Sequence, residues 1–168
     1  MSVILQMEEG GPVRCLIIDT REHKEAIKSI LEYFDNYGYE YERSKLYIGD
    51  YMEYSNPLLV IDRKQSIQEL AQCCASDHER FRRELDRVRK VGAHLVILVE
   101  QNHYKDRDKL YRVDTIEDLM CWSSPHTQVR GEKVYRVLAS WMAKYPISVR
   151  FCSKKDTGKE IIGILYGQ

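Results

Sequence analysis

The sequence predicts a single α/β domain with three layers, in which helices cover both faces of a mixed sheet. Short apolar runs typical of buried strands alternate with segments whose apolar residues recur every three or four positions, as in amphipathic helices. Strands that are interleaved with helices form a sheet that those helices cover. The length of 168 residues is also that of one ordinary domain.

The first elements follow a leader segment. Residues 1–11 are expected to form a flexible leader, and the folded domain is expected to span residues 12–168. The apolar run at residues 15–18 predicts a buried strand. Helical spacing of apolar residues over 27–34 predicts the first helix, and Gly38 is a typical helix end.

A meander of three consecutive strands is expected next. The tyrosine-rich stretch 39–48 predicts its first strand, and residues 51–55 predict its second. Asn56-Pro57 is typical of a turn. Residues 58–64 then form the third strand.

Two helices, a strand and a loop are predicted in the middle of the chain. Helical spacing of apolar residues predicts helices over residues 67–74 and 81–88. The apolar run at 93–100 predicts another buried strand. The polar stretch 103–109 is expected to be a loop.

The second half is expected to be mostly helical. A short helix is predicted over residues 114–122, and a longer one over 134–142 ends before Pro146. A final strand over 147–151 and a last helix over 158–166 complete the domain.

Composition excludes several classes of protein. Lys plus Arg number 26 and Asp plus Glu number 26, so the formal net charge is zero. A histone-like binder that relies on charge alone is therefore excluded, although a local basic face is not. No apolar run approaches the roughly 20 residues that span a bilayer, and the N-terminus does not resemble a secretion signal.

The cysteines favour an intracellular location. There are 5 of them, an odd number, and none forms a C-x-x-C pair. This pattern disfavours a zinc site or a disulfide framework and favours a reducing compartment. In a prokaryote or a phage, that location would be cytoplasmic or nucleoid-associated.

The strongest chemical signal is Asp62-Arg63-Lys64 at the end of an apolar strand. On a strand Asp62 and Lys64 point to the same face, and a hairpin would bring Asp50 beside Asp62. Two carboxylates and a lysine are the minimal parts of a metal-dependent phosphodiesterase. The same residues would also fit a surface strand end whose charges are engaged in ion pairs.

A second group, Asp19-Thr20-Arg21-Glu22, follows the first strand. It adds two carboxylates and an arginine at the carboxyl end of a strand, where sites gather in open α/β sheets. The alternative is a helix N-cap formed by Asp19 or Thr20.

Together, these motifs resemble the XPF/Mus81/Hef-type (ERCC4-domain) nuclease family. That family has a V-D-x-R-E strand end, then G-D, then E-R-K-x-x-x-D. Here Asp19 to Glu22, Gly49-Asp50 and Asp62 to Lys64 stand in the same order. The stretches His78–Glu84 and Leu95–Glu100 extend the resemblance, which covers roughly residues 13–150.

The resemblance implies a restriction-endonuclease-like fold of the PD-(D/E)xK type and cleavage of branched DNA that depends on Mg²⁺ or Mn²⁺. It implies metal ligation by Asp50, Asp62, Glu22 and the backbone carbonyl of Arg63. Lys64 matches the catalytic lysine, and Asp19 and Glu22 match the acidic positions of the first strand end.

The resemblance also suggests which residues contact DNA. Arg21 and Arg63 match arginines that organise the site or hold phosphate, and Arg80 matches an arginine of the long helix. With Arg83, Arg80 belongs to a basic stretch over residues 78–90 that is expected to contact phosphates. The alternative is a solvated helix face with internal ion pairs.

Three departures from the family pattern affect the expectations. Asp62 stands where the family has Glu. Gln68 stands where it has Asp, and Glu69 is expected to point about 100° away from that position. The chain is a single-domain form without the usual helix-hairpin-helix module. DNA affinity would then come from this domain, from a homodimer paired through the 134–142 helix, or from a heterodimer.

The predicted function is that of a metal-dependent DNA endonuclease acting on branched, flap or forked DNA in repair, recombination or replication. The main alternative is a non-catalytic DNA-binding or scaffold partner of an active subunit. A resolvase or restriction enzyme of the wider superfamily would share the chemistry and differ in substrate.

Overall fold

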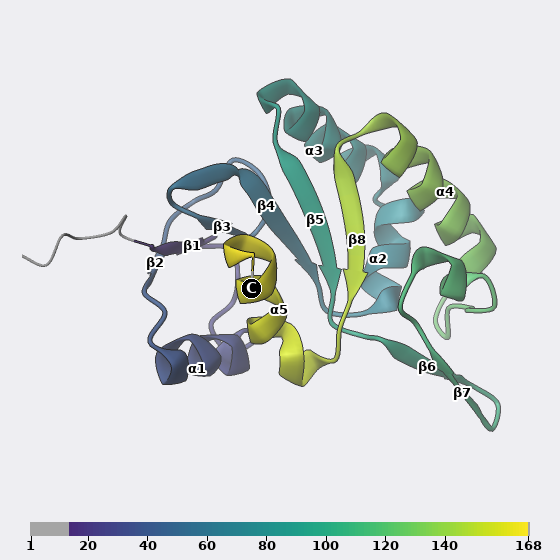
Figure 1. Ribbon diagram of the computed structural model, residues 1–168. Helices are drawn as coiled ribbons and strands as arrows, with labels where there is room; N and C mark the ends of the chain where they lie inside the picture. The colour runs from purple at the N-terminus through teal and green to yellow at the C-terminus, as the bar shows by residue number, and fades with distance from the viewer. Residues whose placement is uncertain (1–13, 168) are drawn as a thin grey trace, which may run out of the picture.

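A six-stranded mixed sheet organises the fold in the computed structural model, which describes residues 14–167 (Figure 1). The strand order is β2-β1-β3-β4-β5-β8. The strands are β1 (Leu16–Ile18), β2 (Tyr41–Arg43), β3 (Tyr51–Glu53), β4 (Asn56–Lys64), β5 (His94–Val99) and β8 (Ile147–Phe151). β4, β5 and β8 run parallel, whereas β3 is antiparallel to both of its neighbours. The predicted leader lies outside the described residues.

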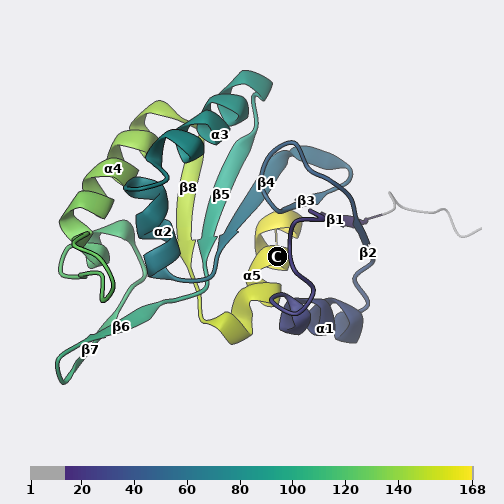
Figure 2. The same ribbon diagram turned by 180° about the vertical axis from the view of Figure 1, so that it is seen from behind.

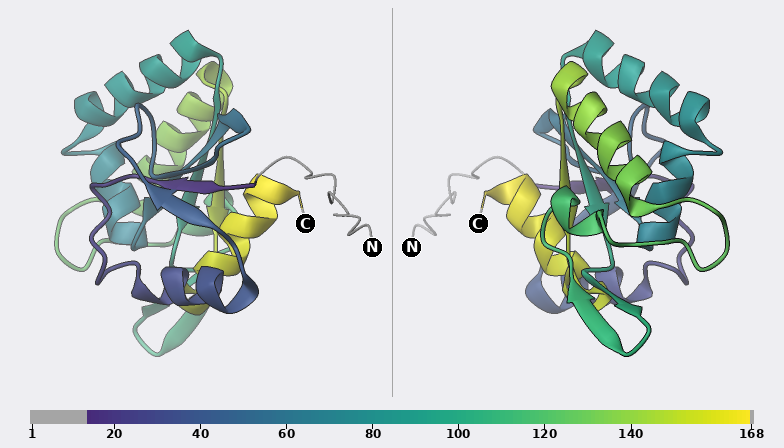
Figure 3. Two further views of the ribbon diagram at one scale, coloured as in Figure 1. Left: turned by 90° about the vertical axis from the view of Figure 1, so that its left-hand side faces the viewer. Right: turned by 90° about the vertical axis from the view of Figure 1, so that its right-hand side faces the viewer.

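Helices cover both faces of this sheet. They are α1 (Lys28–Tyr37), α2 (Ile67–Cys74), α3 (His78–Val91), α4 (Gly131–Lys144) and α5 (Thr157–Tyr166). α2, α3 and α4 lie together against β4, β5 and β8 (Figure 2). Figure 3 shows α1 in purple and α5 in yellow side by side, away from α3 in teal. The three-layer α/β prediction is confirmed.

Alternation along β5 divides the interior into two cores. Leu95 and Ile97 pack with α2, α3 and α4, whereas Val96 and Leu98 pack with α1 and α5. Successive strand residues point to opposite faces, and both faces are covered. This is why β5 reads as a continuous apolar run.

The predicted meander is wrong in one respect. β1 lies between β2 and β3, so the chain must cross the end of β1 after Arg43. That crossing occupies residues 44–50, and only Tyr41–Arg43 is strand. The turn before β4 lies at Tyr54-Ser55, two residues earlier than predicted.

A hairpin replaces the loop predicted at residues 103–109. Its strands are β6 (His103–Asp106) and β7 (Lys109–Arg112), and the rings of Tyr104 and Tyr111 stack across it. Most of its side chains are exposed, so the sequence lacks the alternation that signals a half-buried strand. The helix predicted over 114–122 is a single 3₁₀ turn, Ile116–Leu119.

The apolar residues of α4 belong to the core. Val134, Leu138 and Trp141 are buried against α2 and the sheet. Of the two roles that their spacing allows, core packing or a dimer contact, these three side chains take the first. Between residues 14 and 167, no helix combines the length and apolarity needed to cross a bilayer.

Candidate active site

An acidic pocket of about 230 Å³ lies where β4 ends, beside the residues that lead into β3 and beneath α3. Its lining residues are Arg21, Glu22, Gly49, Asp50, Asp62, Arg63, Lys64, Glu69, Cys73, Asp77, Arg80, Phe81 and Glu84. Both of the motifs that follow β1 and end β4 therefore reach one pocket. Figure 1 shows β3 and β4 side by side, with α3 to one side of them.

The β3–β4 hairpin brings Asp50 and Asp62 together. The amide of Asp50 donates to the carbonyl of Ile61 over 2.7 Å, and its Oδ2 accepts from the amide of Arg63 over 2.8 Å. Burial, followed by the nearby carboxylates of Asp62 and Glu22, raises the pKa of Asp50 well above its ordinary value. The pocket therefore concentrates negative charge that a cation would neutralise.

Gly49 is required by this hairpin. Its φ is +65°, and a Cβ built there would lie 2.5 Å from Cγ1 of Val60 and 2.8 Å from the carbonyl oxygen of Ile61. No other residue fits so close to β4 in that conformation. The glycine therefore sets the approach of Asp50 to Asp62.

Lys64 shares the pocket face of β4 with Asp62. Its Nζ lies 2.7 Å from Oδ2 of Asp62 and 5.0 Å from the centre of the Phe81 ring. Burial is the largest influence and lowers the pKa of Lys64, but the charges of Asp62, Cys73 and Asp50 and the hydrogen bond to Asp62 together outweigh it and leave that pKa above its ordinary value. In the metal-free protein Lys64 is therefore held as a cation beside Asp62.

The Arg63 side chain points to the opposite face of β4. Its Nε lies 2.6 Å from Oε2 of Glu22, and its Nη1 lies 2.9 Å from Oε2 of Glu100. Tyr51 also donates to Oε2 of Glu22 over 2.9 Å. The Arg63 side chain is only 3% exposed, so the structure corrects the expectation that it holds phosphate. It organises the site, and its partner Glu100 was not predicted.

Asp19 is not brought into the pocket. It is fully buried, and its Oδ2 accepts from the amide of Leu46 over 2.7 Å. Arg21 donates to both of its oxygens, over 2.7 and 3.0 Å. Nor does it cap a helix, since α1 begins only at Lys28. Asp19 therefore links the loop after β1 to the crossing at residues 44–50.

The other three arginines that were predicted to contact DNA, Arg21, Arg80 and Arg83, are all exposed but lie in different places. The Arg21 side chain is 61% exposed at the pocket edge. Arg80 is also exposed and lines the pocket, whereas Arg83 is exposed outside its lining. Arg21 and Arg80 are thus the two cations at the pocket that remain accessible to a phosphate.

The start of α2 reverses the expected orientation of two side chains. Gln68 accepts from Ser124 over 2.6 Å and does not line the pocket, whereas Glu69 does. The two side chains do point different ways, as expected, but Glu69 and not position 68 faces the site. Gln68 lies on the side of α2 that contacts the 123–127 loop.

Sequence reasoning missed the contribution of α3. Asp77, Phe81 and Glu84 follow helical spacing and share one flank of the helix. Oε1 of Glu84 accepts from the amide of Gly49 over 2.9 Å. Burial, then the charge of Asp62, raises the pKa of Glu84. The i, i+4, i+7 spacing of Asp77, Phe81 and Glu84 could have predicted that they lie on one side of the helix.

Cys73 lines the pocket without being a reactive thiolate. Burial is the main cause that raises its pKa to about 11. At neutral pH the group is a thiol, which is a poor nucleophile and a poor metal ligand. The chemistry of the pocket therefore rests on its carboxylates and Lys64.

The donor set fits magnesium or manganese. Within residues 14–167, no three His, Cys, Asp or Glu side chains converge closely enough to chelate a metal by themselves. Mg²⁺ usually takes only one or two protein carboxylates and completes its shell with water and phosphate oxygens. Asp50 and Asp62 supply that pair, and the unfavourable burial of the Asp50 charge is what a cation would relieve.

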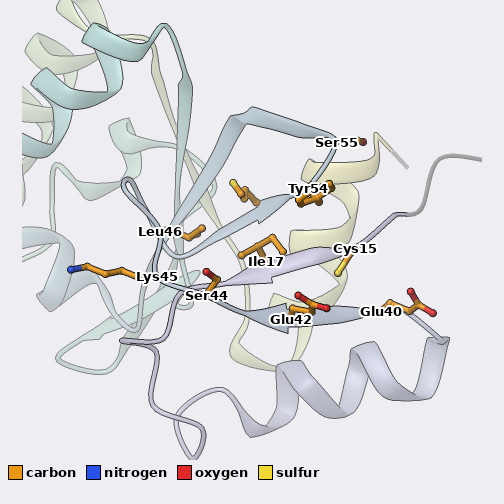
Figure 4. A pocket seen from close by; sticks show the side chains of 10 residues that line it. Cys15, Ile17, Glu40, Glu42, Ser44, Lys45, Leu46, Tyr54 and Ser55 are labelled. Carbon is orange, nitrogen blue, oxygen red and sulfur yellow. The ribbon is translucent and has the colours of Figure 1, made fainter.

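A larger hollow, about 740 Å³, lies elsewhere, over β1, β2 and β3 (Figure 4). Ile17 and Met52 contribute apolar surface, and Glu40 and Glu42 line one side. These carboxylates would repel the phosphates of a nucleic acid. Although this hollow is larger than the acidic pocket, it is therefore not the candidate site for phosphodiester chemistry.

Comparisons with known proteins agree with this geometry. Residues 18–164 match the family model for the ERCC4 domain. The solved structure of XPF from Aeropyrum pernix superimposes with a TM-score of 0.63 at 19% sequence identity, covering 90% of this chain and 63% of that chain. XPF from Aeropyrum pernix in complex with DNA gives the same values. The chain thus matches less than two thirds of the length of those proteins.

A search of curated proteins finds no match. The likeness to XPF shows the fold, and the family model covers most of the chain. The chain therefore belongs to the ERCC4 domain family of nuclease domains.

Proposed function

We propose that this protein is a metal-dependent endonuclease that hydrolyses phosphodiester bonds in branched, flap or forked DNA. The observation that carries the proposal is the convergence of Asp50, Asp62 and Lys64 in one buried acidic pocket. The exposed Arg21 and Arg80 stand at its edge, where a phosphate would approach. The family also supports a DNA-processing role in repair, recombination or replication.

Asp50, Asp62 and the carbonyl of Arg63 would hold Mg²⁺ or Mn²⁺, with Glu22 nearby. When bound, the cation supplies charge neutralisation at the scissile phosphate and lowers the pKa of water. Glu22 is a weaker candidate ligand than the two aspartates because its Oε2 already accepts from Arg63 and Tyr51.

Lys64 stabilises negative charge in this proposal. In the metal-free protein its contact with Asp62 favours the protonated form. A cation fixed by Asp62 and Phe81 is preorganised to stabilise the negative charge that develops on the phosphate.

The remaining residues position the others. Arg63 joins the ends of three strands through Glu22 and Glu100, and its amide holds Asp50. Asp19 holds Arg21 at the pocket edge. These residues act through Asp50 and Arg21 without reaching the reacting phosphate.

The test is cleavage of labelled duplex, single-stranded, flap and fork DNA with Mg²⁺, with Mn²⁺ and with a chelator. Metal-dependent cutting that disappears in Asp62→Ala supports the proposal and ranks the substrates. The same loss in Asp62→Ala excludes a contaminating nuclease, and Asp108→Ala, which changes an exposed aspartate of the β6–β7 turn, should keep the wild-type activity. Cutting that persists in Asp62→Ala would reject the site.

One observation favours the second candidate function, a non-catalytic DNA-binding or scaffold partner: Gln68 stands where the family has a carboxylate. A folded protein that binds forked DNA and cuts none of these substrates with either metal would favour this function. Cleavage would then require an active partner subunit.

A further inference from the structure

A groove between α3 and α4 gathers positive charge away from the acidic pocket. Two adjoining hollows of about 270 and 420 Å³ share Arg136 and Val137. Their charged lining residues are Arg82, Arg130, Glu132, Lys133, Arg136 and Lys144. Five of these six are positive, in a chain whose formal net charge is zero. This local excess is typical of a surface that meets a polyanion.

The positive residues of α4 form a line. Lys133, Arg136, Ser140 and Lys144 follow helical spacing on one exposed face. At 1.5 Å per residue the line is about 16 Å long, which matches about five nucleotides of one B-form strand. Arg82 of α3 lies across the groove from it.

These cations are available to a ligand. Among residues 14–167, Arg130, Lys133 and Lys144 take part in no ion pair. Arg136 pairs with Glu132 over 2.6 Å, and Arg82 pairs with Glu79 over 2.9 Å and with Asp86 over 3.8 Å, but these side chains are exposed to solvent. Exposed pairs of this kind contribute little, so a phosphate would displace Glu132 readily.

The floor of the groove offers no ring for base stacking. Trp141 is buried, and the ring of His78 packs against it. Tyr145 donates its hydroxyl to Asp86, and Arg89 covers its ring. Contacts would therefore be to phosphates, which position a nucleic acid without reading its sequence.

α3 separates the groove from the acidic pocket. Its buried stripe is Phe81, Leu85 and Val88. Asp77 and Glu84 flank that stripe on the pocket side, whereas His78 and Arg82 flank it on the groove side. The acidic pocket and the groove adjoin at the N-terminal end of α3, where Asp77 lines the pocket and the next residue, His78, lines the groove. Figure 2 shows α3 and α4 as neighbours on the same face of the sheet.

We propose that the α3–α4 groove binds the sugar-phosphate backbone of a second DNA arm, while the arm to be cut lies in the acidic pocket. The proposal rests on the proposed function, since it assigns the second arm of that branched substrate. It is a binding role, so it is tested without cleavage.

The experiment compares three proteins for binding to fluorescent DNA by anisotropy, over a salt series from about 50 to 300 mM without divalent metal. They are the wild type, the groove variant Lys133→Gln/Arg136→Gln/Lys144→Gln, and the control Lys154→Gln/Lys155→Gln/Lys159→Gln. The control removes the same charge from exposed lysines outside the groove. The DNAs are a fork and a duplex that matches one of its arms.

For the fork, the groove variant should bind at least about tenfold more weakly, and its plot of log K against log salt should be shallower by about 2–3. Its affinity for the duplex, and the control's affinity for both DNAs, should change less than about threefold. A wild type that binds no fork, or a groove variant that binds the fork as the wild type does, overturns the proposal. Equal losses on fork and duplex overturn the assignment of a second arm.

A footprint locates the contact independently. Acetylation of lysines followed by mass spectrometry should show Lys133 and Lys144 protected in the fork complex and Lys154 unprotected. A wild type that binds the fork through these lysines but cuts no DNA would reject the proposed function and keep this groove. A protein that cuts DNA while Lys133 and Lys144 stay fully reactive in the fork complex would keep the proposed function and reject the groove.

Discussion

Nζ of Lys64 lies 2.7 Å from Oδ2 of Asp62, on the face of β4 that lines the acidic pocket. The residue between them, Arg63, points to the other face and is held by Glu22 and Glu100. One strand thus supplies a cation and a carboxylate on one side and their support on the other.

Lys64→Met should reduce cleavage by about 10²–10³-fold, because it removes a preorganised charge near the scissile phosphate. Lys64→Arg keeps the charge and should retain more activity than Lys64→Met. Single-turnover rates at saturating DNA measure both effects, and circular dichroism shows whether the fold is intact. Equal rates in the Met variant and the wild type would mean that Lys64 has no part in the chemistry.

Asp50→Asn should stabilise the metal-free protein while abolishing cleavage. The change removes a buried charge that faces Asp62 and Glu22, and the amide oxygen can still accept from Arg63. We expect a rise of about 2–4 °C in Tm for each 1 kcal/mol gained, measured by thermal unfolding in chelator. Added Mg²⁺ should raise the Tm of the wild type and of the exposed control Asp108→Asn, but not that of Asp50→Asn. A metal-dependent rise in Asp50→Asn would contradict its assignment as a ligand.

Asp19 should make the protein sensitive to acid. Burial alone would raise its pKa, but the hydrogen bonds from Arg21 and Leu46 outweigh burial and lower it. A lowered pKa in the folded state contributes stability that is present above the unfolded value of about 3.9 and is lost as the pH falls toward the folded value.

Asp19→Asn should therefore lower the free energy of unfolding at pH 7 by about 1–3 kcal/mol. It should also lose less stability than the wild type between about pH 5 and pH 3. Urea unfolding at a series of pH values measures both effects. If the free energy of unfolding changed with pH in the same way in both proteins, Asp19 would contribute nothing to the acid sensitivity.

Gly49 and Gly92 form a matched pair. Both have positive φ, but a Cβ at Gly92 meets nothing within 4 Å, whereas one at Gly49 meets Val60 at 2.5 Å. Gly92→Ala should cost about 1 kcal/mol of stability through its backbone conformation alone. Gly49→Ala should cost several times more and should reduce cleavage by displacing Asp50. Similar losses of stability in the two variants would show that the close approach to Val60 is unimportant.

The sequence predicted correctly the elements whose apolar pattern lies within a single short segment. The buried run of β5 and the helical spacing of α2, α3 and α4 were confirmed because both faces of the sheet are covered. The pairing of Asp50 with Asp62 also followed from a short hairpin. The resemblance of ordered motifs then supplied the fold, which the likeness to XPF confirms.

What the sequence could not show depends on contacts between distant segments. The insertion of β1 between β2 and β3 leaves no local trace, so residues 44–48 of the crossing were predicted as strand. Asp19 resembled a site residue because its partner, the amide of Leu46, is 27 positions away. The face of α2 that meets the pocket could not be read from the sequence, because Gln68 contacts a loop residue 56 positions away.

The two-residue turn between β3 and β4 has a consequence for the order of folding. Closing a short loop costs little chain entropy, so Asp50 and Asp62 can meet early as the chain folds. Glu84 joins the pocket, and Glu100 joins Arg63 on the other face of β4, only after the parallel pairing of β4 with β5, which requires two helices to be formed and packed. Pulse-labelled amide hydrogen exchange during refolding should therefore report two stages, with the hairpin that carries Asp50 and Asp62 assembled before the elements that hold it rigid.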